Sequence, residues 1–313
     1  MKKLVSLISP VYNNAPTLPT LVQRLQDEVI CKRPNYDFEM IFVNDGSHDN
    51  SLEVLKELAK KDSRITIVNF TRNFGQIYAI LAGWRMAKGD VSIDFSADLQ
   101  DPPFQCVNML DEWEKGYKVV VSHRIENHES FVRRITSKLF YNLILPEAPN
   151  GGFDFTLLDR QALDIITSFK DKNKFYQADI LSLGLPFSAI PYVKEERKEG
   201  KSQYTTIKRV RFFLNMYMNI SYGPIKWVSA LGFVTTLIGF IYALVVLLAY
   251  FLHHTPFSGY TPLMLVILIV GGLIMLSLGV IGQYIWRILD EVRARPNYII
   301  QGVINYPNES ETK

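Results

Sequence analysis

Two long uncharged apolar runs near the carboxyl end constrain this chain more than any other feature. They cover residues 228 to about 252 and 263 to about 286. Each exceeds the roughly 20 residues that an α-helix needs to cross the hydrocarbon core of a bilayer. Neither run has a polar face, which argues against a helix buried in a soluble core. The sequence therefore predicts a transmembrane hairpin over residues 227–289.

Charged residues around the two runs predict the orientation of this hairpin. The link at 253–262 contains no Lys or Arg, whereas both outer flanks are basic. The flanking residues are Lys208, Arg209, Arg211 and Lys226 before the first run, and Arg287, Arg293 and Arg295 after the second. Because Lys and Arg concentrate on the cytoplasmic side, we expect a multi-pass protein of the inner (cytoplasmic) membrane. Both termini then lie in the cytoplasm, and residues 290–313 form a cytoplasmic tail.

Residues 205–226, just before the hairpin, mix basic with large apolar side chains. Phe212, Phe213 and Met216 lie among the basic residues, a composition typical of an amphipathic helix at a membrane surface. The alternative is a helix that packs against the preceding domain.

Residues 1–204 predict an α/β domain. Short β-branched runs alternate with helix-period stretches, and such alternation indicates βαβ units and a mostly parallel, doubly wound, Rossmann-like sheet. The predicted strands are 4–9, 39–43, 65–70, 91–95 and 118–122, and the predicted helices are near 17–29, 51–61, 75–88 and 104–115. Ligands of such sheets bind beyond the carboxyl ends of the strands, so the residues after each strand are the candidates for function.

Composition narrows the class of protein. The chain is 48% hydrophobic and 21% charged, which supports a large core and argues against disorder. A net charge of +3 is too small to predict nucleic-acid binding. Cys31 and Cys106 have no metal-ligand spacing, so we interpret them as reduced thiols.

Polar loops follow the first three predicted strands. Tyr12 lies in the loop after the first strand, and Asp45 lies in the loop after the second. We expect the Tyr12 ring to stack on a base and the Asp45 carboxylate to accept hydrogen bonds from base or ribose. An isolated Asp-Gly-Ser is only a turn, but two such loops at adjacent strand ends favour a nucleotide pocket. After the third strand, Arg72 and Gly75 precede a helix, an arrangement that suits a diphosphate.

The fourth strand ends in the richest of these loops, with Asp98 and Asp101 close together. A carboxylate at this position can hold Mg²⁺ or Mn²⁺ against the two phosphates of a nucleotide sugar. The alternative is an acidic surface turn.

Several segments, in order along the chain, resemble glycosyltransferase family 2. More narrowly, they are similar to the polyprenyl-phosphate glycosyltransferases, the group of bactoprenol glucosyltransferase and dolichol-phosphate mannose synthase. The segments are Pro10-Val-Tyr-Asn, Phe42-Val-Asn-Asp-Gly-Ser, Arg72-Asn-Phe-Gly-Gln, Ala97-Asp-Leu-Gln-Asp-Pro-Pro, Gly152-Phe-Asp-Phe, Gly200-Lys-Ser-Gln-Tyr204 and Ile281-Gly-Gln-Tyr-Ile. The resemblance therefore spans nearly the whole chain.

This resemblance implies a GT-A fold, a UDP- or GDP-sugar donor, a divalent metal ion and an inverting displacement. It places nucleotide-sugar binding at Pro10, Tyr12, Asn13, Asp45, Arg72, Gly75, Ser96, Ala97, Asp98 and Gln100. The family usually has Asp-Ala-Asp at the metal loop, whereas Ser96 stands first here. We therefore expect Asp98 to be the principal metal ligand and Ser96 a weaker one.

The acceptor implied by the resemblance, a polyprenyl phosphate, needs positioning more than deprotonation. A phosphate monoester has its second pKa at about 6 and is mostly dianionic at neutral pH, so cationic side chains would position it. The resemblance points to Asp154 as the catalytic carboxylate, with a structural turn as the alternative. Further catalytic candidates, each also readable as a solvated surface charge, are Arg124, Arg133, Arg134, Arg197, Lys201 and Ser202.

Together these features predict an enzyme whose catalytic domain lies in the cytoplasm. We expect it to transfer a hexose, glucose first and N-acetylglucosamine second, from a UDP-sugar to undecaprenyl phosphate for modification of cell-envelope glycans. Its expected partners are the two substrates and the lipid bilayer, without nucleic acid, and a homo-oligomer stays open.

Three other functions share some of these features. Ser96 suggests a catalytically impaired, membrane-bound scaffold that binds sugar nucleotides. A processive polysaccharide synthase should show a Gln-x-x-Arg-Trp motif, whereas Trp286 and Arg287 are reversed here. A transporter is disfavoured because two uncharged spans offer no polar pathway.

Overall fold

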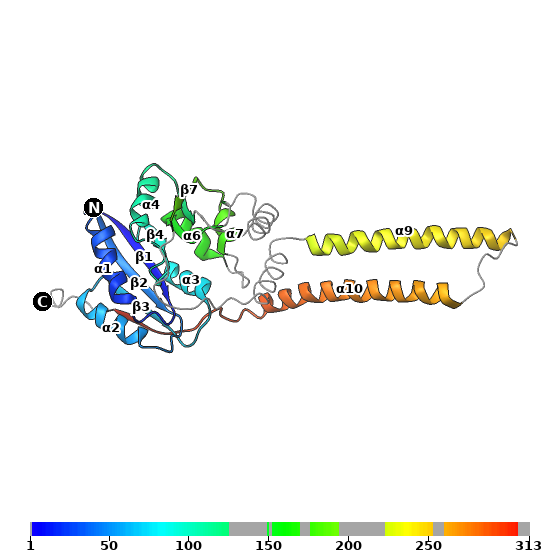
Figure 1. Ribbon diagram of the computed structural model, residues 1–313, viewed down its shortest axis with the longest axis horizontal. Helices are drawn as coiled ribbons and strands as arrows, with labels where there is room; N and C mark the ends of the chain where they lie inside the picture. The colour runs from blue at the N-terminus through cyan, green and yellow to red at the C-terminus, as the bar shows by residue number, and fades with distance from the viewer. Residues whose placement is uncertain are drawn as a thin grey trace. The chain divides into compact units, whose positions relative to one another are not determined.

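The computed structural model describes residues 2–124, 149, 152–169, 176–193, 223–252 and 260–305. The chain divides into two compact units. Unit 1 comprises Met1–Gln203 together with Pro296–Lys313, and unit 2 comprises Tyr204–Arg295. Unit 1 is an α/β domain, and unit 2 contains two long helices (Figure 1).

Unit 1 is built on one sheet whose eight described strands follow the order β7-β5-β6-β4-β1-β2-β3-β8. The strands are β1 (Lys3–Val11), β2 (Tyr36–Asn44), β3 (Ile65–Phe70), β4 (Val91–Asp94), β5 (Val119–Arg124), β6 (Phe155–Asp159), β7 (Phe187–Tyr192) and β8 (Ile300–Asn305). The central strands β4, β1, β2 and β3 are parallel, as are β5 and β7. The five predicted strands are confirmed as β1 to β5.

Helices cover both faces of this sheet. The described helices of unit 1 are α1 (Leu18–Leu25), its π-helical continuation η1 (Gln26–Ile30), α2 (Ser51–Lys61), α3 (Gln76–Met86), α4 (Gln105–Glu114), α6 (Arg160–Ser168) and α7 (Tyr176–Leu181). One hydrophobic cluster joins α1, α2 and α4 to the sheet, and a second joins α3, α6 and α7. In β1, Val5 and Leu7 belong to the first cluster and Ile8 to the second. Because both faces are buried, the central strands appear as nearly continuous apolar runs, which made them easy to predict.

Two strands break the parallel pattern. β6 runs antiparallel to both β4 and β5, and β8 runs antiparallel to β3. The sequence predicts a cytoplasmic tail at 290–313, but Ile300–Asn305 form β8 within the sheet. Without this strand, β3 would leave a row of backbone groups unpaired at the sheet edge. Unit 1 therefore includes a segment that follows the long helices in the sequence.

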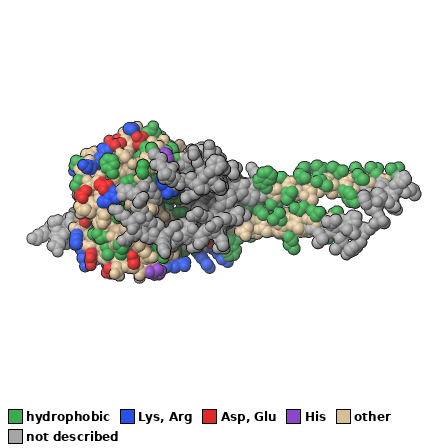
Figure 2. Space-filling view, viewed as in Figure 1, with side chains coloured by type: hydrophobic (Ala, Val, Ile, Leu, Met, Phe, Trp, Pro, Cys, Tyr) green, Lys and Arg blue, Asp and Glu red, His purple; other side chains and the backbone are tan. Residues whose placement is uncertain are grey.

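Unit 2 contains α9 (Gly223–Phe251) and α10 (Tyr260–Val292), which lie side by side and antiparallel (Figure 1). Both predicted apolar runs are thus helical. Large apolar side chains are exposed along both helices (Figure 2), with Trp227, Phe233 and Met275 each at least 70% exposed. Such continuous apolar exposure is typical of a lipid-facing surface.

The two helices differ in how much of each could cross a membrane. Ile269–Val292 in α10 is long and apolar enough to do so, and the described part of α9 has the shorter apolar stretch Trp227–Tyr242. The two-span topology stays a prediction.

Gly83 allows α3 to approach β1 closely, and its replacement tests this packing. A Cβ at Gly83 would lie 2.3 Å from Cγ2 of Ile8, a β-branched residue that is stiff at χ1. Alanine is the better helix former by about 1 kcal/mol, but overpacking costs about 1–3 kcal/mol. We expect Gly83→Ala to lower the midpoint of thermal unfolding in detergent by a few degrees. In an Ile8→Ala background the same change should cost less, and an equal cost in both backgrounds would contradict the close contact.

Candidate active site

The sheet has its topological switch point at β1. The chain proceeds from β1 through β2 to β3 on one side, while β4 pairs with β1 on the other. Open α/β sheets bind ligands outside the carboxyl ends of the strands at such a point. All of the predicted nucleotide-sugar residues lie at the carboxyl ends of β1 to β4 or in the loops that follow, namely Pro10, Tyr12, Asn13, Asp45, Arg72, Gly75, Ser96, Ala97, Asp98 and Gln100.

The loops after β1 and β2 are joined by hydrogen bonds. The Asn13 N–H donates to Ser47 Oγ at 3.0 Å, and the His48 N–H donates to Asn13 Oδ1 at 2.8 Å. Asn13 adopts a left-handed conformation with φ of 54°, which Asn tolerates better than most residues. The Tyr12 ring meets His48 edge-on at 6.3 Å and stays partly exposed. Asn13 therefore holds the two loops together, while the Tyr12 ring is accessible for stacking.

Asp45 ties the end of β2 to the loop between β3 and α3. Its side chain is only 2% exposed, and its two oxygens accept hydrogen bonds from the N–H groups of Phe74 (2.6 Å) and Gly75 (2.9 Å). Burial raises the pKa of Asp45, while the two backbone donors act in the opposite direction. The structure thus gives Asp45 a loop-fixing role that the sequence did not reveal. Carboxylate oxygens accept more than one hydrogen bond, so its predicted contact with a base stays a prediction.

Two glycines in these loops adopt positive φ angles, and one of them also allows a close contact. Gly46 has φ of +63°, and a Cβ there would lie 2.3 Å from the backbone carbon of Arg72. Gly75 has φ of +103° at the start of α3. Between them, the exposed Arg72 places its guanidinium 4.8 Å from the centre of the Phe74 ring. Arg72 is thus a cation beside the start of a helix, as a diphosphate site requires.

The loop after β4 holds Asp98 in a defined position. Asp98 Oδ1 accepts hydrogen bonds from the Ser96 hydroxyl (2.9 Å) and the Gln100 N–H (3.1 Å). Leu99 between them is left-handed, with φ of 58°. Asp98 is partly exposed, whereas Ala97 and Pro10 are buried and shape the site from beneath.

The same loop fits a divalent cation only if other ligands complete the site. The described residues contain no group of three His, Cys, Asp or Glu side chains able to hold a metal by themselves. Mg²⁺ commonly binds through one or two carboxylates together with substrate phosphates. The oxygens of Asp98 and Ser96 fit a site of this shared kind.

Tyr192 connects this loop to Asp154. Its hydroxyl lies 3.0 Å from Asp101 Oδ1 and 3.1 Å from Asp154 Oδ2, while Asp101 Oδ2 accepts from the Ser96 N–H at 3.2 Å. Tyr192 is 4% exposed, and burial, reinforced by the two carboxylates, raises its pKa so that the hydroxyl keeps its proton. A polar path thus runs from the exposed Asp154 to the loop after β4. The sequence gives no signal for Tyr192, because β7 has no clear alternation of apolar residues.

Arg124 is the last residue of β5 and the register partner of Tyr192 in β7. Because β4, β5 and β7 run in the same direction, Arg124 lies at the sheet edge that carries the other candidates. Its neighbour His123 has its pKa lowered by burial. The other predicted catalytic residues, Arg133, Arg134, Arg197, Lys201 and Ser202, lie outside the described residues.

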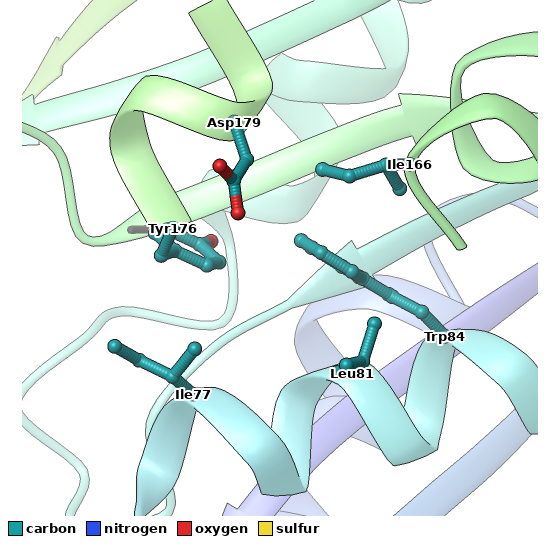
Figure 3. A pocket seen from close by; sticks show the side chains of 6 residues that line it. All are labelled: Ile77, Leu81, Trp84, Ile166, Tyr176 and Asp179. Atoms are coloured by element: carbon teal, nitrogen blue, oxygen red, sulfur yellow. The ribbon is translucent and has the colours of Figure 1, made fainter. Parts of the chain in front are cut away.

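A buried carboxyl group lies at the end of β4, just before the loop that carries Asp98. Asp94 is 0% exposed, and its Oδ2 accepts a hydrogen bond from Tyr176 at 2.6 Å. The Tyr176 hydroxyl also hydrogen-bonds Thr156, and its ring stacks on Trp84 with ring centres 5.6 Å apart. Figure 3 shows this aromatic pair in a small pocket between α3, α6 and α7. Burial raises the pKa of Asp94 to about 8, against the opposing effect of the Tyr176 hydrogen bond. Asp94 is therefore mostly uncharged at neutral pH, which the sequence did not indicate.

This raised pKa predicts how stability depends on pH. Asp94 binds its proton up to about pH 8 in the folded chain, but only up to about pH 4 in the unfolded chain. Its contribution to stability is thus fully present below about pH 4 and is lost as pH rises to about 8. Asp94→Asn cannot ionise, so we expect its thermal midpoint to fall less than that of the unaltered chain between pH 5 and 8.5. Asp98→Asn, in the exposed part of the loop, is the control, and parallel profiles for all three would contradict the assignment.

Several named proteins are similar to the chain over nearly its full length. It is 36% identical over 301 residues to the uncharacterized glycosyltransferase YkcC of Bacillus subtilis (strain 168), covering 95% of this chain and 93% of that protein. It is 30% identical over 302 residues to the SfII prophage-derived bactoprenol glucosyl transferase of Shigella flexneri, and the alignment covers 95% of this chain and 97% of that protein. It is 31% identical over 320 residues to the undecaprenyl-phosphate 4-deoxy-4-formamido-L-arabinose transferase of Edwardsiella ictaluri (strain 93-146). The alignment covers 99% of this chain and 98% of that protein.

Comparison with a solved structure and a family model agrees with the fold. Mannosyl-3-phosphoglycerate synthase from Rubrobacter xylanophilus superposes with a TM-score of 0.50 at 16% identity, over 70% of this chain and 73% of that one. This likeness concerns the fold alone, and it supports the predicted GT-A, Rossmann-like architecture. The model of glycosyl transferase family 2 matches residues 6–181, which include the loops after β1, β2, β3 and β4. The chain therefore belongs to glycosyl transferase family 2 and is a glycosyltransferase.

Proposed function

We propose that this glycosyltransferase moves a hexose from a UDP-sugar to undecaprenyl phosphate with inversion. The product would be a polyprenyl-phosphate sugar used to modify cell-envelope glycans. One observation carries this proposal. The chain aligns over 95% or more of its length with relatives named for bactoprenol or undecaprenyl phosphate, so the alignment extends beyond the catalytic domain into α9 and α10.

The sugar is the least constrained part of the proposal. Two relatives of nearly equal identity, 30% and 31%, are named for glucose and for 4-deoxy-4-formamido-L-arabinose. We place glucose first, because the bactoprenol glucosyl transferase supports it, and N-acetylglucosamine second.

The reaction is a single displacement at the anomeric carbon. A phosphate oxygen of the acceptor forms a bond to this carbon as the bond to the UDP oxygen breaks, and UDP leaves with the electron pair. The acceptor phosphate is mostly dianionic at neutral pH, so it needs orientation rather than a strong base. Arg124, at the carboxyl end of β5, is suited to orient it and balance its charge.

Two carboxylates have separate roles in this reaction, one in metal binding and one in orienting a substrate. A Mg²⁺ or Mn²⁺ ion held by Asp98 and Ser96 would supply positive charge to the departing diphosphate. Asp154, with one oxygen hydrogen-bonded to Tyr192, orients the sugar or the incoming phosphate.

We also propose that α9 and α10 both cross the inner membrane, with the catalytic domain and both termini in the cytoplasm. The exposed apolar side chains of both helices support this. So does the charge pattern, with no Lys or Arg in 253–262 and basic residues on both outer flanks.

A catalytically impaired scaffold is the second candidate function, and Ser96 is the observation that favours it. However, the Ser96 hydroxyl donates to Asp98 and so helps to orient the principal metal ligand. A serine in this role is compatible with catalysis.

Sugar transfer in detergent tests the proposal directly. Purified protein would receive undecaprenyl phosphate, Mg²⁺ or Mn²⁺, and labelled UDP-glucose, UDP-N-acetylglucosamine or UDP-4-deoxy-4-formamido-L-arabinose. We expect a lipid-extractable product from one donor, lost with EDTA and reduced at least about 100-fold in Asp98→Ala, since loss of charge stabilisation at a reacting centre has effects of this order. UDP binding without lipid product from any donor would instead support the scaffold.

Tyr192→Phe tests whether the hydroxyl positions Asp154. The ring packs edge-on against Phe155 at 5.4 Å, and phenylalanine preserves this contact. We expect kcat to fall about tenfold or more, because a misplaced catalytic group loses rate steeply, while KM for the donor changes little. Tyr36→Phe is the matched control, since Tyr36 is also buried and donates to a carboxylate, that of Glu114 on α4. Equal kcat values for the two variants would exclude a positioning role.

A further inference from the structure

Strand β8 brings a side chain from beyond the long helices into contact with the nucleotide side of the site. β8 pairs with β3, and the register shifts so that Asn69 faces Gly302 while Phe70 faces Ile300. Gln301 is the extra residue of this irregularity, and such bulges turn a side chain in a new direction. Gln301 Oε1 accepts a hydrogen bond from Asn69 Nδ2 at 2.8 Å.

The contact continues inward through buried amides. Asn69 Oδ1 accepts from Asn44 Nδ2 at 2.7 Å, and these side chains are 9% and 2% exposed. Asn44 ends β2 and directly precedes Asp45. Three amides thus link β8 to the residue that holds the loop between β3 and α3. Each amide orients the next, because an amide oxygen only accepts and an amide nitrogen only donates.

An aromatic path runs beside the amide path. Tyr298 stacks on Phe70 with ring centres 5.0 Å apart, and Phe70 meets Phe74 edge-on at 5.7 Å. Phe74 supplies one of the two N–H groups that bind Asp45. The backbone adds a further bond, from the Thr71 N–H to the Ile299 carbonyl at 3.1 Å.

The two paths converge on Asp45. One reaches it through the preceding residue in β2, and the other through the loop that carries Arg72 and Gly75. We propose that the segment 298–305 positions the nucleotide-binding loops and that Gln301 is its principal positioning residue. This inference rests on the proposed function, since it assumes that these loops bind the UDP part of the donor.

Gln301→Met is the sharpest single change. Methionine has nearly the same length as glutamine but no amide oxygen, so Asn69 Nδ2 loses its acceptor. Hydrogen bonds of this kind contribute enough to change affinity about threefold to tenfold. We expect the Kd for UDP and the KM for the UDP-sugar to rise by that factor, with kcat nearly unchanged. Gln301→Glu keeps an acceptor at an exposed position, so it should bind UDP like the unaltered chain.

Asn305→Leu is a matched control in the same strand. Asn305 Nδ2 donates to Thr66 Oγ1 at 2.9 Å, and Asn305 pairs with Thr66 at the opposite end of β3 from the nucleotide loops. This variant loses one amide hydrogen bond between β8 and β3, like Gln301→Met, but it lies away from Asp45. We expect a similar loss of thermal stability and no change in the Kd for UDP.

The measurement is isothermal titration of UDP into full-length protein in detergent, followed by donor kinetics. Weaker binding in Gln301→Met alone, restored in Gln301→Glu, would support the inference. Unchanged binding in Gln301→Met, or equal weakening in Asn305→Leu, would overturn it while leaving the proposed function intact. If the unaltered protein binds neither UDP nor any UDP-sugar of the panel, the proposed function fails and this inference fails with it.

Discussion

Burial of the parallel strands on both faces is the constraint on which the rest of this structure depends. β1 lies between β2 and β4 with helices on either side, so most of its middle residues are apolar, and the buried Ser6 among them donates a hydrogen bond to Glu39. The polar groups of the candidate site lie at the strand ends, where the chain leaves the sheet. Because β1 to β4 are parallel, their carboxyl ends lie at the same edge, and four separate loops are brought together there.

Buried carboxyl groups give these loops their shape. Asp45 binds two backbone N–H groups of the loop after β3, and Asp101 binds the Ser96 N–H and the Tyr192 hydroxyl. A buried carboxylate without donors would be strongly disfavoured, so each of these groups requires the neighbouring loop to stay in place. This coupling explains how the partly exposed Asp98 and the exposed Asp154 can be held in position while remaining accessible to substrates.

The sequence predicted the parts of the fold that depend on local pattern. Strands β1 to β5 and the first four helices follow from apolar periodicity, and the polar loops follow from their places at strand ends. β6, β7 and β8 were not predicted, because their strand character depends on pairing with distant strands. The same limit applies to the site. The motifs identified Asp98 and Asp154, but Tyr192 and Gln301 gain their roles only when β7 and β8 have paired.

The return of the chain to the sheet also constrains the membrane topology. Met1–Gln203 and Pro296–Lys313, which flank the segment that contains α9 and α10, both belong to unit 1, and β8 is hydrogen-bonded to β3. A folded domain cannot lie partly on each side of a bilayer, so the segment between its two parts must cross the membrane an even number of times. A single span through α10 would place β8 and β3 on opposite sides of the bilayer, so their pairing favours the proposed two-span hairpin over a single span. The exposed apolar surface of α9 and α10 argues against a topology with no membrane span. The pairing of the edge strand β8 with β3 therefore supports the same hairpin that hydropathy and flanking charge predict.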